Sequence, residues 1–366
     1  MKSPYMRRAL DLAVRARGCT SPNPMVGAVI VKSGKIIAEG FHKKAGGDHA
    51  EIAALKAIRK AKKSAKGAIL YVTLEPCCHR GKTPPCTDAV VASGIKKVVL
   101  AARDPNPLVA GKGIEKLKKA GITVLEGLLQ KEAKKLNEAY EKFITQKVPF
   151  VVMKAASSLD GKIASETGQS KWITNETARK KVHEMRQDCD VVMVGINTIL
   201  KDDPSLNVRP VKKGAKQPLR LIVDTTLKTE PDASVFHSQG GRVLIAAGTD
   251  APASRLKPLE QKGAEILRIG LKNDRVNLKE LMKALAKMNV VSILLEGGGE
   301  LFTSALASGI VDRVALFYAP IILGGSGRYS MVHGKGVKQI SDAMKIHDVA
   351  VTQLDGNILV EGAIAR

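Results

Sequence analysis

Short apolar segments alternate with amphipathic helical segments along the chain, and this alternation most constrains its fold. In the first half, apolar runs at 68–74, 96–102 and 122–127 are separated by helical patterns. Strands joined through helices form sheets that the helices cover. We therefore expect an α/β/α sandwich, which begins with a helix near 3–17 and a hairpin that turns at Ser33–Gly34.

A charged helical segment separates the two halves. It covers 128–149 and ends at Pro149, after which a new apolar run begins. Since the chain has 366 residues and domains typically have about 100–200, we expect two domains, 1–146 and 147–366. The second half again alternates strands and helices and shows no repeat of the first, so it is expected to be a different α/β domain.

The net charge of +24 raises the question of nucleic-acid binding. The lysines are spread over the whole chain, however, mostly on helical patterns where they face solvent. Only 3% of the residues are aromatic, which leaves little material for base stacking. The charge therefore favours anionic small molecules such as phosphates over nucleic acid.

The sequence contains no membrane segment, because no stretch approaches the ~18 consecutive apolar residues that one needs. The basic N-terminus lacks the apolar core of a signal peptide, although an organelle presequence is an alternative. Three of the five cysteines lie close together, which suits a metal or reactive site in a reducing compartment. We expect a cytoplasmic protein that makes no membrane contact, and a homo-oligomer is left open.

A histidine, a glutamate and cysteines form the first candidate site. His49 and Glu51 stand where an Ala-rich helix begins. Residues two apart on a regular helix point about 200° away from each other, so these two can share a site only at the first turn. Cys77 and Cys78 follow a strand and a proline, and Cys86 precedes a helix.

One histidine and two cysteines are the ligand count of a catalytic zinc, which keeps a fourth position for a water whose pKa it lowers to about 7. Glu51 would then be the catalytic residue that carries protons from this water to the substrate. Each part of the pattern alone is usually structural, and only their joint occurrence favours zinc. The alternative of another class is a structural zinc module, which has four protein ligands and needs no Glu51.

The residues His49-Ala50-Glu51 and the stretch "EPCCHRGKTPPC" (75–86) resemble the cytidine-deaminase superfamily, and specifically the pyrimidine deaminase domain of bifunctional riboflavin-biosynthesis proteins. The long insertion before Cys86 and the upstream "SPNPMVG" carry the narrower resemblance. It implies that zinc is held by His49, Cys77 and Cys86, with Cys78 as a competing ligand, and that Asn23 contacts the substrate. Further residues that could face the substrate are His79 and Lys82.

Three segments of the second half carry the second candidate site, 153–174, 194–209 and 290–306. In the last, a buried strand ends at Glu296, three glycines let a ligand approach, and a helix starts near Glu300 with N–H groups suited to phosphate. Such a turn can also serve packing alone. It does not match the G-x-G-x-x-G fingerprint, so a Rossmann fold is not supported.

In this order the three segments resemble the reductase domain of the same bifunctional proteins, which has a dihydrofolate-reductase-like fold. The resemblance thus covers nearly the whole chain. It implies a bifunctional zinc hydrolase and NADP-dependent oxidoreductase. The chain would deaminate 2,5-diamino-6-(5-phosphoribosylamino)pyrimidin-4-one and then use NADPH to reduce the ribosyl group to ribityl. The alternative enzyme is a zinc deaminase of another nucleobase, including one in tRNA, with an accessory domain.

The resemblance also implies the ligand contacts of the second half. The residues that would hold NADP are Ala156, Trp172, Thr198, Asp202, Thr225, Gly298, Gly299, Glu300, Leu301, Phe302, Thr303 and Ser304. Those that would hold the substrate are Lys154, Ser170, Arg186, Leu206, Arg209 and Glu296. Lys154 could instead extend to solvent, and Trp172 could be a core anchor. No residue identifies a pocket for the 2′-phosphate, so NADP over NAD rests on the resemblance.

Overall fold

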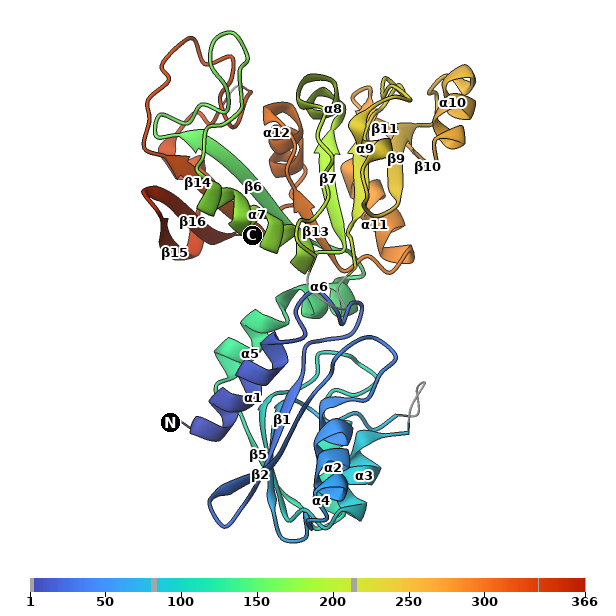
Figure 1. Ribbon diagram of the computed structural model, residues 1–366, viewed down its shortest axis with the longest axis vertical. Coiled ribbons are helices and arrows are strands. Elements are labelled where there is room, and N and C mark those ends of the chain that lie inside the picture. Colours follow the sequence, from blue (N-terminus) through green and yellow to red (C-terminus); the bar gives the residue numbers. More distant parts are fainter. Residues whose placement is uncertain (1–2, 80–83, 212–215, 335, 366) are drawn as a thin grey trace. The chain divides into compact units, whose positions relative to one another are not determined.

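The computed structural model describes residues 3–79, 84–211, 216–334 and 336–365. The chain divides into two compact units, Met1–Lys147 and Val148–Arg366 (Figure 1). No helix in these described ranges has the length and apolar character needed to cross a lipid bilayer.

The first unit is built on one five-stranded sheet of order β2-β1-β3-β4-β5. The β1–β2 hairpin and the β1–β3 pair are antiparallel, whereas β3, β4 and β5 run parallel. The strands are β1 (Gly27–Lys32), β2 (Lys35–Phe41), β3 (Ile69–Leu74), β4 (Lys97–Ala102) and β5 (Thr123–Glu126).

Helices cover both faces of this sheet, because neighbouring strand residues point to opposite sides. Ile30 of β1 packs with α2, α3 and α4, while Val29 packs with α1 and α5 on the other face. The helices are α1 (Pro4–Val14), α2 (Ala50–Lys60), α3 (Cys86–Ala92), α4 (Lys112–Lys119) and α5 (Gln130–Leu136). The expected α/β/α sandwich is confirmed.

The connecting segment is not the single helix that its pattern predicts. It forms α5 and a separate helix α6 (Glu138–Gln146), with a break at Asn137. The Asn137 side chain accepts a hydrogen bond from the Met25 N–H (2.8 Å) and donates one to the Met25 carbonyl (2.9 Å). This amide–backbone pair, far apart in sequence, holds the junction in a non-helical conformation.

The second unit contains a nine-stranded sheet of order β10-β9-β8-β7-β13-β6-β14-β16-β15. Its strands run parallel from β10 to β14, whereas β16 pairs antiparallel with β14, and the edge strand β15 pairs antiparallel with β16. The strands are β6 (Phe150–Ser158), β7 (Val191–Gly195), β8 (Leu219–Val223), β9 (Val243–Gly248), β10 (Ala264–Ile269), β13 (Ser292–Leu295), β14 (Arg313–Ala319), β15 (Ile346–Leu354) and β16 (Asn357–Ile364). A small hairpin is formed by β11 (Leu271–Lys272) and β12 (Arg275–Val276).

Helices also cover both faces of this second sheet, so the α/β architecture expected here is confirmed. On one face, α11 and α12 pack on residues such as Met193 and Leu221, whereas α8, α9 and α10 pack on Val194 and Ile222 of the other. A further helix, α7, packs on Phe317 of β14. The helices are α7 (Glu176–Asp188), α8 (Ile196–Asp202), α9 (Ser234–His237), α10 (Leu256–Gln261), α11 (Leu278–Lys287) and α12 (Gly299–Ala307).

Candidate active sites

Three side chains of types that can bind a metal meet where β3, α2 and α3 come together. His49 is the N-cap of α2, Cys86 is the first residue of α3, and Cys77 follows β3. Their ligand atoms all lie within 4.8 Å of one another. His49 Nδ1 is 3.2 Å from Cys86 Sγ and 3.6 Å from Cys77 Sγ, and the Cys86 N–H donates to Cys77 Sγ (3.3 Å).

The two thiols of this group are electrostatically unequal. Hydrogen bonds from Cys86 and His49 lower the pKa of Cys77 to about 4. The hydrogen bond with Cys77, together with burial, raises the pKa of Cys86. Two thiolates side by side in this place are unfavourable unless a cation partners them.

The neighbouring Cys78 lies outside this group. Its Sγ is 4.0 Å from the Leu108 carbonyl oxygen, and burial raises its pKa. Among the described cysteines, Cys77 and Cys86 are the two that the structure brings to His49. His79 is exposed, and Lys82 lies outside the described residues.

Glu51 occupies the first turn of α2 and is buried, with 3% of its surface exposed. His49 has the extended backbone of an N-cap (φ −68°, ψ 161°), so the regular helical rotation between positions 49 and 51 does not apply. Both side chains therefore reach Cys86. Burial raises the pKa of Glu51 to about 7, which suits a group that takes up and releases a proton.

Asn23 is held by a histidine that sequence reasoning missed. His42 Nδ1 faces the Asp48 carbonyl oxygen (2.9 Å), which only accepts, so Nδ1 carries the proton. Its Nε2 then accepts a hydrogen bond from Asn23 Nδ2 (3.1 Å). The His42 ring also meets the His49 ring edge-on at 5.5 Å between centroids. His42 thus connects Asn23 to the loop that carries His49, and no motif in the sequence marks it.

In the second unit, a cavity of about 840 Å³ opens at the carboxyl ends of β7 and β8 and beside the N-terminus of α12. Nine of the candidate residues line it: Ser170, Thr198, Asp202, Thr225, Gly298, Gly299, Glu300, Leu301 and Ser304. Ser170 and Asp202 are joined by a hydrogen bond (2.7 Å between Oγ and Oδ1). Candidate substrate and cofactor contacts therefore meet at this cavity.

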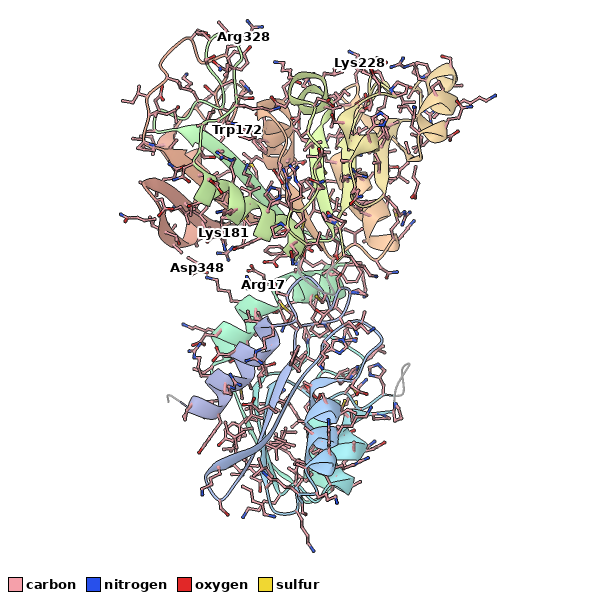
Figure 2. The ribbon with its side chains drawn as sticks, in the orientation of Figure 1. Arg17, Trp172, Lys181, Lys228, Arg328 and Asp348 are labelled. Carbon is pink, nitrogen blue, oxygen red and sulfur yellow. The ribbon has the colours of Figure 1, made fainter. Side chains whose placement is uncertain are left out.

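Other NADP candidates lie away from the lining of this cavity. Phe302 is buried in the core, and Thr303 Oγ1 donates to the Gly299 carbonyl (2.7 Å), while Ala156 is half-buried on β6. Trp172, labelled in Figure 2, is 72% exposed and stacks on the Arg179 guanidinium at 4.6 Å. The alternative that Trp172 is a core anchor is therefore wrong.

The three glycines at the start of α12 (297–299) do not contribute equally. A side chain at Gly297 would meet the Gly195 backbone (2.8 Å), and one at Gly299 would overlap the His333 ring (2.2 Å). These two glycines serve close packing of protein atoms. At Gly298 the nearest atom is Thr198 Oγ1 at 3.8 Å, so only this glycine leaves room for a ligand against the backbone.

A buried charged cluster joins three of the substrate candidates. Arg186 of α7 makes two parallel hydrogen bonds to Glu296 (2.6 and 2.9 Å), and Lys154 Nζ lies 3.9 Å from the same carboxylate. Burial opposes ionisation of Glu296, but the charge and hydrogen bonds of Arg186 keep its pKa below the usual range. The Lys154 side chain is only 16% exposed and is paired with Glu296 rather than extended to solvent, and burial lowers its pKa.

This cluster changes the roles expected of the two arginines. Arg186 is occupied, since Nη1 also donates to the Asn207 carbonyl (3.0 Å). Arg209 is exposed, and within the described ranges its guanidinium has no hydrogen-bond or ion-pair partner. Arg209 is therefore the arginine that is free to bind a phosphate. Leu206 is buried, with 2% exposed.

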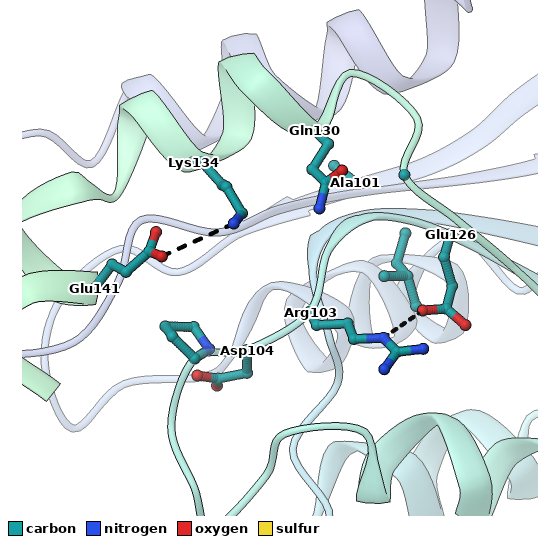
Figure 3. Close-up of a pocket in the computed structure, with 10 residues that line it drawn as sticks. Ala101, Arg103, Asp104, Glu126, Gln130, Lys134 and Glu141 are labelled. Carbon is teal, nitrogen blue, oxygen red and sulfur yellow. Dashed lines mark hydrogen bonds and ion pairs between the residues drawn. The ribbon is translucent and has the colours of Figure 1, made fainter. Parts of the chain in front are cut away.

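A second cavity, of about 400 Å³, lies in the first unit beyond the carboxyl ends of β4 and β5 (Figure 3). Its charges are paired with each other: Arg103 with Glu126 (2.6 Å) and Lys134 with Glu141 (3.9 Å). Asp104 accepts from the Tyr140 hydroxyl (3.0 Å). The candidate site residues do not line this cavity.

Comparison with known proteins finds similarity over nearly the whole chain. Residues 1–102 match the family described as "Cytidine and deoxycytidylate deaminase zinc-binding region", and residues 149–360 match "RibD C-terminal domain". The chain is 43% identical to riboflavin biosynthesis protein RibD of Actinobacillus pleuropneumoniae, over 98% of this chain and 94% of the relative. It is also 43% identical to that of Aquifex aeolicus, over 97% and 96%.

Solved structures are also similar to this chain over nearly its whole length. The fold resembles Acinetobacter baumannii RibD with a TM-score of 0.87 at 37% identity, covering 99% of this chain and 98% of the other. It also resembles a Thermotoga maritima protein described as a diaminohydroxyphosphoribosylaminopyrimidine deaminase/5-amino-6-(5-phosphoribosylamino)uracil reductase. There the TM-score is 0.85 at 40% identity, again covering 99% and 98%.

Proposed function

The chain belongs to the RibD family of bifunctional riboflavin-biosynthesis deaminase/reductases, and we propose that its first unit performs the deamination and its second unit the reduction. The two family matches, 1–102 and 149–360, fall in separate compact units. The proposed substrate is 2,5-diamino-6-(5-phosphoribosylamino)pyrimidin-4-one. The full-length similarity carries this proposal and leaves no part of the chain as an accessory domain for a different deaminase.

We infer that His49, Cys77 and Cys86 hold the zinc ion. The fit rests on the donor set, since one imidazole nitrogen and two sulfurs within 4.8 Å are ligands that zinc prefers. Zinc, when bound, makes a water molecule nucleophilic at neutral pH. A structural zinc site would need four protein ligands, whereas the described residues bring three together here.

Glu51 is proposed to move the protons of the deamination. The reaction forms a carbon–oxygen bond at the pyrimidine C2, breaks its carbon–nitrogen bond and releases ammonia. The Glu51 carboxylate takes one proton from the attacking water and gives it to the ring nitrogen. It then takes the remaining proton from the hydroxyl group now on C2 and gives it to the exocyclic amine, which leaves as ammonia while the C2 carbonyl forms. Its burial beside Cys86 excludes bulk water from this transfer. Asn23, oriented by His42, would hold the pyrimidine.

The second unit is proposed to bind NADPH, which supplies the hydride for C1′ of the sugar. A cavity of about 840 Å³ has the volume of a cofactor site. Gly298 is open, and the N-terminus of α12 presents N–H groups suited to a diphosphate. The Lys154–Glu296–Arg186 cluster would hold the sugar, and Arg209 would pair with the 5′-phosphate. Incubating the chain with the diamino substrate, with and without NADPH, tests both activities.

Replacing Arg209 by alanine should raise the KM of the reductase for its phosphorylated substrate. A charge-assisted hydrogen bond contributes about 1.5–3 kcal/mol, which corresponds to an increase of about 10- to 100-fold. Steady-state kinetics on the deaminated substrate measure this change, and deamination by the same protein should be unaffected. Arg242→Ala, which removes an exposed arginine paired with Glu265, is the control. An unchanged KM would remove Arg209 from the site.

A further inference from the structure

The segment 205–209 connects α8 to the region before β8 and carries two of the proposed substrate contacts, Leu206 and Arg209. Leu206 has a backbone φ of +52°, a left-handed conformation that is unfavourable for a residue with a side chain. Such a conformation persists only when the surroundings hold it. Side chains from three other parts of the second unit do so.

One anchor comes from β8 and the loop before β9. The Arg220 side chain is buried with 4% exposed, and its Nη1 donates to the Val235 carbonyl (2.6 Å) and the Ser205 carbonyl (3.4 Å). Asn207 Nδ2 donates to the Gln239 carbonyl (3.0 Å). These bonds fix the first half of the segment against the 235–241 loop.

A second anchor comes from α7. Arg186 Nη1 donates to the Asn207 carbonyl (3.0 Å), and the Arg209 N–H donates to His183 Nδ1 (3.3 Å). The same Arg186 is fixed in two hydrogen bonds by Glu296. The segment is thereby tied to the charged cluster proposed to hold the sugar.

The third anchor is Gln217, whose one amide group satisfies both backbone groups of Val208. Its Oε1 accepts from the Val208 N–H (2.8 Å) and its Nε2 donates to the Val208 carbonyl (3.0 Å). Val208 is 1% exposed, so water has no access to replace these bonds. The main chain of Gln217 is itself confined by its neighbour Pro218, on which Gly241 packs closely. A side chain at Gly241 would overlap the Pro218 carbonyl oxygen (2.0 Å).

We propose that Gln217 is a positioning residue for the reductase, which acts through Val208 to fix the Arg209 guanidinium at the substrate phosphate. The proposal rests on the proposed role of Arg209. Without Gln217, the buried N–H and C=O of Val208 lose their partners, and a buried polar group without a partner is unfavourable. The segment is then expected to shift so that these groups find other partners or water. Arg209, which follows Val208 in the chain, shifts with it.

The test compares two reductase substrates, the deaminated substrate with its 5′-phosphate and the same compound without it. In full-length Gln217→Ala we expect the KM for the phosphorylated substrate to rise about tenfold, equivalent to about 1.4 kcal/mol, with kcat changed less than about twofold. Kinetics on the dephosphorylated substrate should be unchanged. The deaminase activity of the same protein reports that it is folded, and Gln261→Ala, an exposed glutamine at the end of α10, is the matched control.

Two further variants separate positioning from a general structural role. Gln217→Glu keeps the acceptor for the Val208 N–H and loses the donor, so its effect should be intermediate, and it remains usable if the alanine variant does not fold. In a protein that already carries Arg209→Ala, Gln217→Ala should raise the KM for the phosphorylated substrate by less than about a further twofold. Both substitutions act on the same contact, that of Arg209 with the phosphate.

An equal loss of kcat/KM on both substrates, or no loss on either, would overturn the proposal. If Gln217→Ala raises the KM for the phosphorylated substrate while Arg209→Ala does not, the proposed role of Arg209 is wrong. A wild-type protein that reduces neither substrate would instead contradict the proposed function itself.

Discussion

Glu51→Gln should lower the turnover of deamination by about a thousandfold or more while the protein keeps its zinc. Positioned general acid–base groups contribute about 10²–10⁴-fold, and Glu51 is asked to carry a proton in more than one step. Glutamine preserves the shape of this buried side chain but cannot accept a proton. Ammonia release under substrate saturation measures the change, with zinc content determined on the same preparation.

The control for this variant is Glu115→Gln, which alters an exposed glutamate in the first turn of α4 in the same unit. It should deaminate like the wild type. Reduction of the already deaminated substrate should be normal in both variants, because the reductase site is built from the other unit. Deamination within about tenfold of the wild type in Glu51→Gln would exclude Glu51 as the proton carrier.

Cys86→Ser should abolish zinc binding and deamination together. Cys86 is fully buried beside His49 and Cys77, so the substitution leaves two ligands and a hydroxyl that does not ionise as a thiol does. After dialysis, zinc should fall from one ion per chain in the wild type to below about a tenth of that. Metal analysis measures this directly, and the reductase activity of the variant serves as the test of folding.

The adjacent Cys77 and Cys78 provide a matched pair for the same measurement. Cys77→Ser should lose zinc as Cys86→Ser does, whereas Cys78→Ser should retain it, because Cys78 Sγ faces the Leu108 carbonyl. If Cys78→Ser loses zinc and Cys77→Ser retains it, Cys78 rather than Cys77 is the zinc ligand. Full retention in Cys86→Ser would refute the set altogether.

A strand or helix can be predicted from the sequence where a short, continuous pattern of apolar residues specifies it. The apolar run at 68–74 becomes β3 (Ile69–Leu74), and that at 96–102 becomes β4 (Lys97–Ala102), because burial on both faces requires continuous apolar residues. The break at Asn137 could not be predicted, since its cause is a contact with Met25 far away in the chain. Strand order is equally non-local, as in the insertion of β13 between β7 and β6.

One missed element left a signal in the sequence. Helix α7 begins after Asn175, whose side chain accepts from the Ala178 N–H (2.9 Å) as an N-cap does. An asparagine followed by Glu176 is a recognisable helix start. The helix matters for function because it carries both His183 and Arg186.

The two sites differ in how far the sequence identifies them. His49, Glu51, Cys77 and Cys86 stand at helix starts and a strand end, so short-range spacing is enough to select them. The partners that orient substrate contacts leave no such trace: Gln217 reaches Val208 only through the tertiary fold.

Charge patterns were also ambiguous in the second half. Arg186 and Arg209 are both expected to hold the substrate, but only the structure shows that Glu296 pairs with the Arg186 guanidinium while, among the described residues, that of Arg209 has no partner. The same holds for the glycines at the start of α12, of which packing accounts for Gly297 and Gly299.

We expect one chain to deaminate its substrate first and to reduce the product second, in separate units. The most direct test supplies the phosphorylated diaminopyrimidine to the purified full-length protein and follows ammonia, NADPH and the pyrimidine products over time. Without NADPH, the deaminated ribosyl compound should accumulate with one equivalent of ammonia. With NADPH, this compound should appear and then give way to the ribityl product as one NADPH is consumed. Consumption of NADPH without release of ammonia, or a ribityl product that still carries its 2-amino group, would contradict this order of reactions.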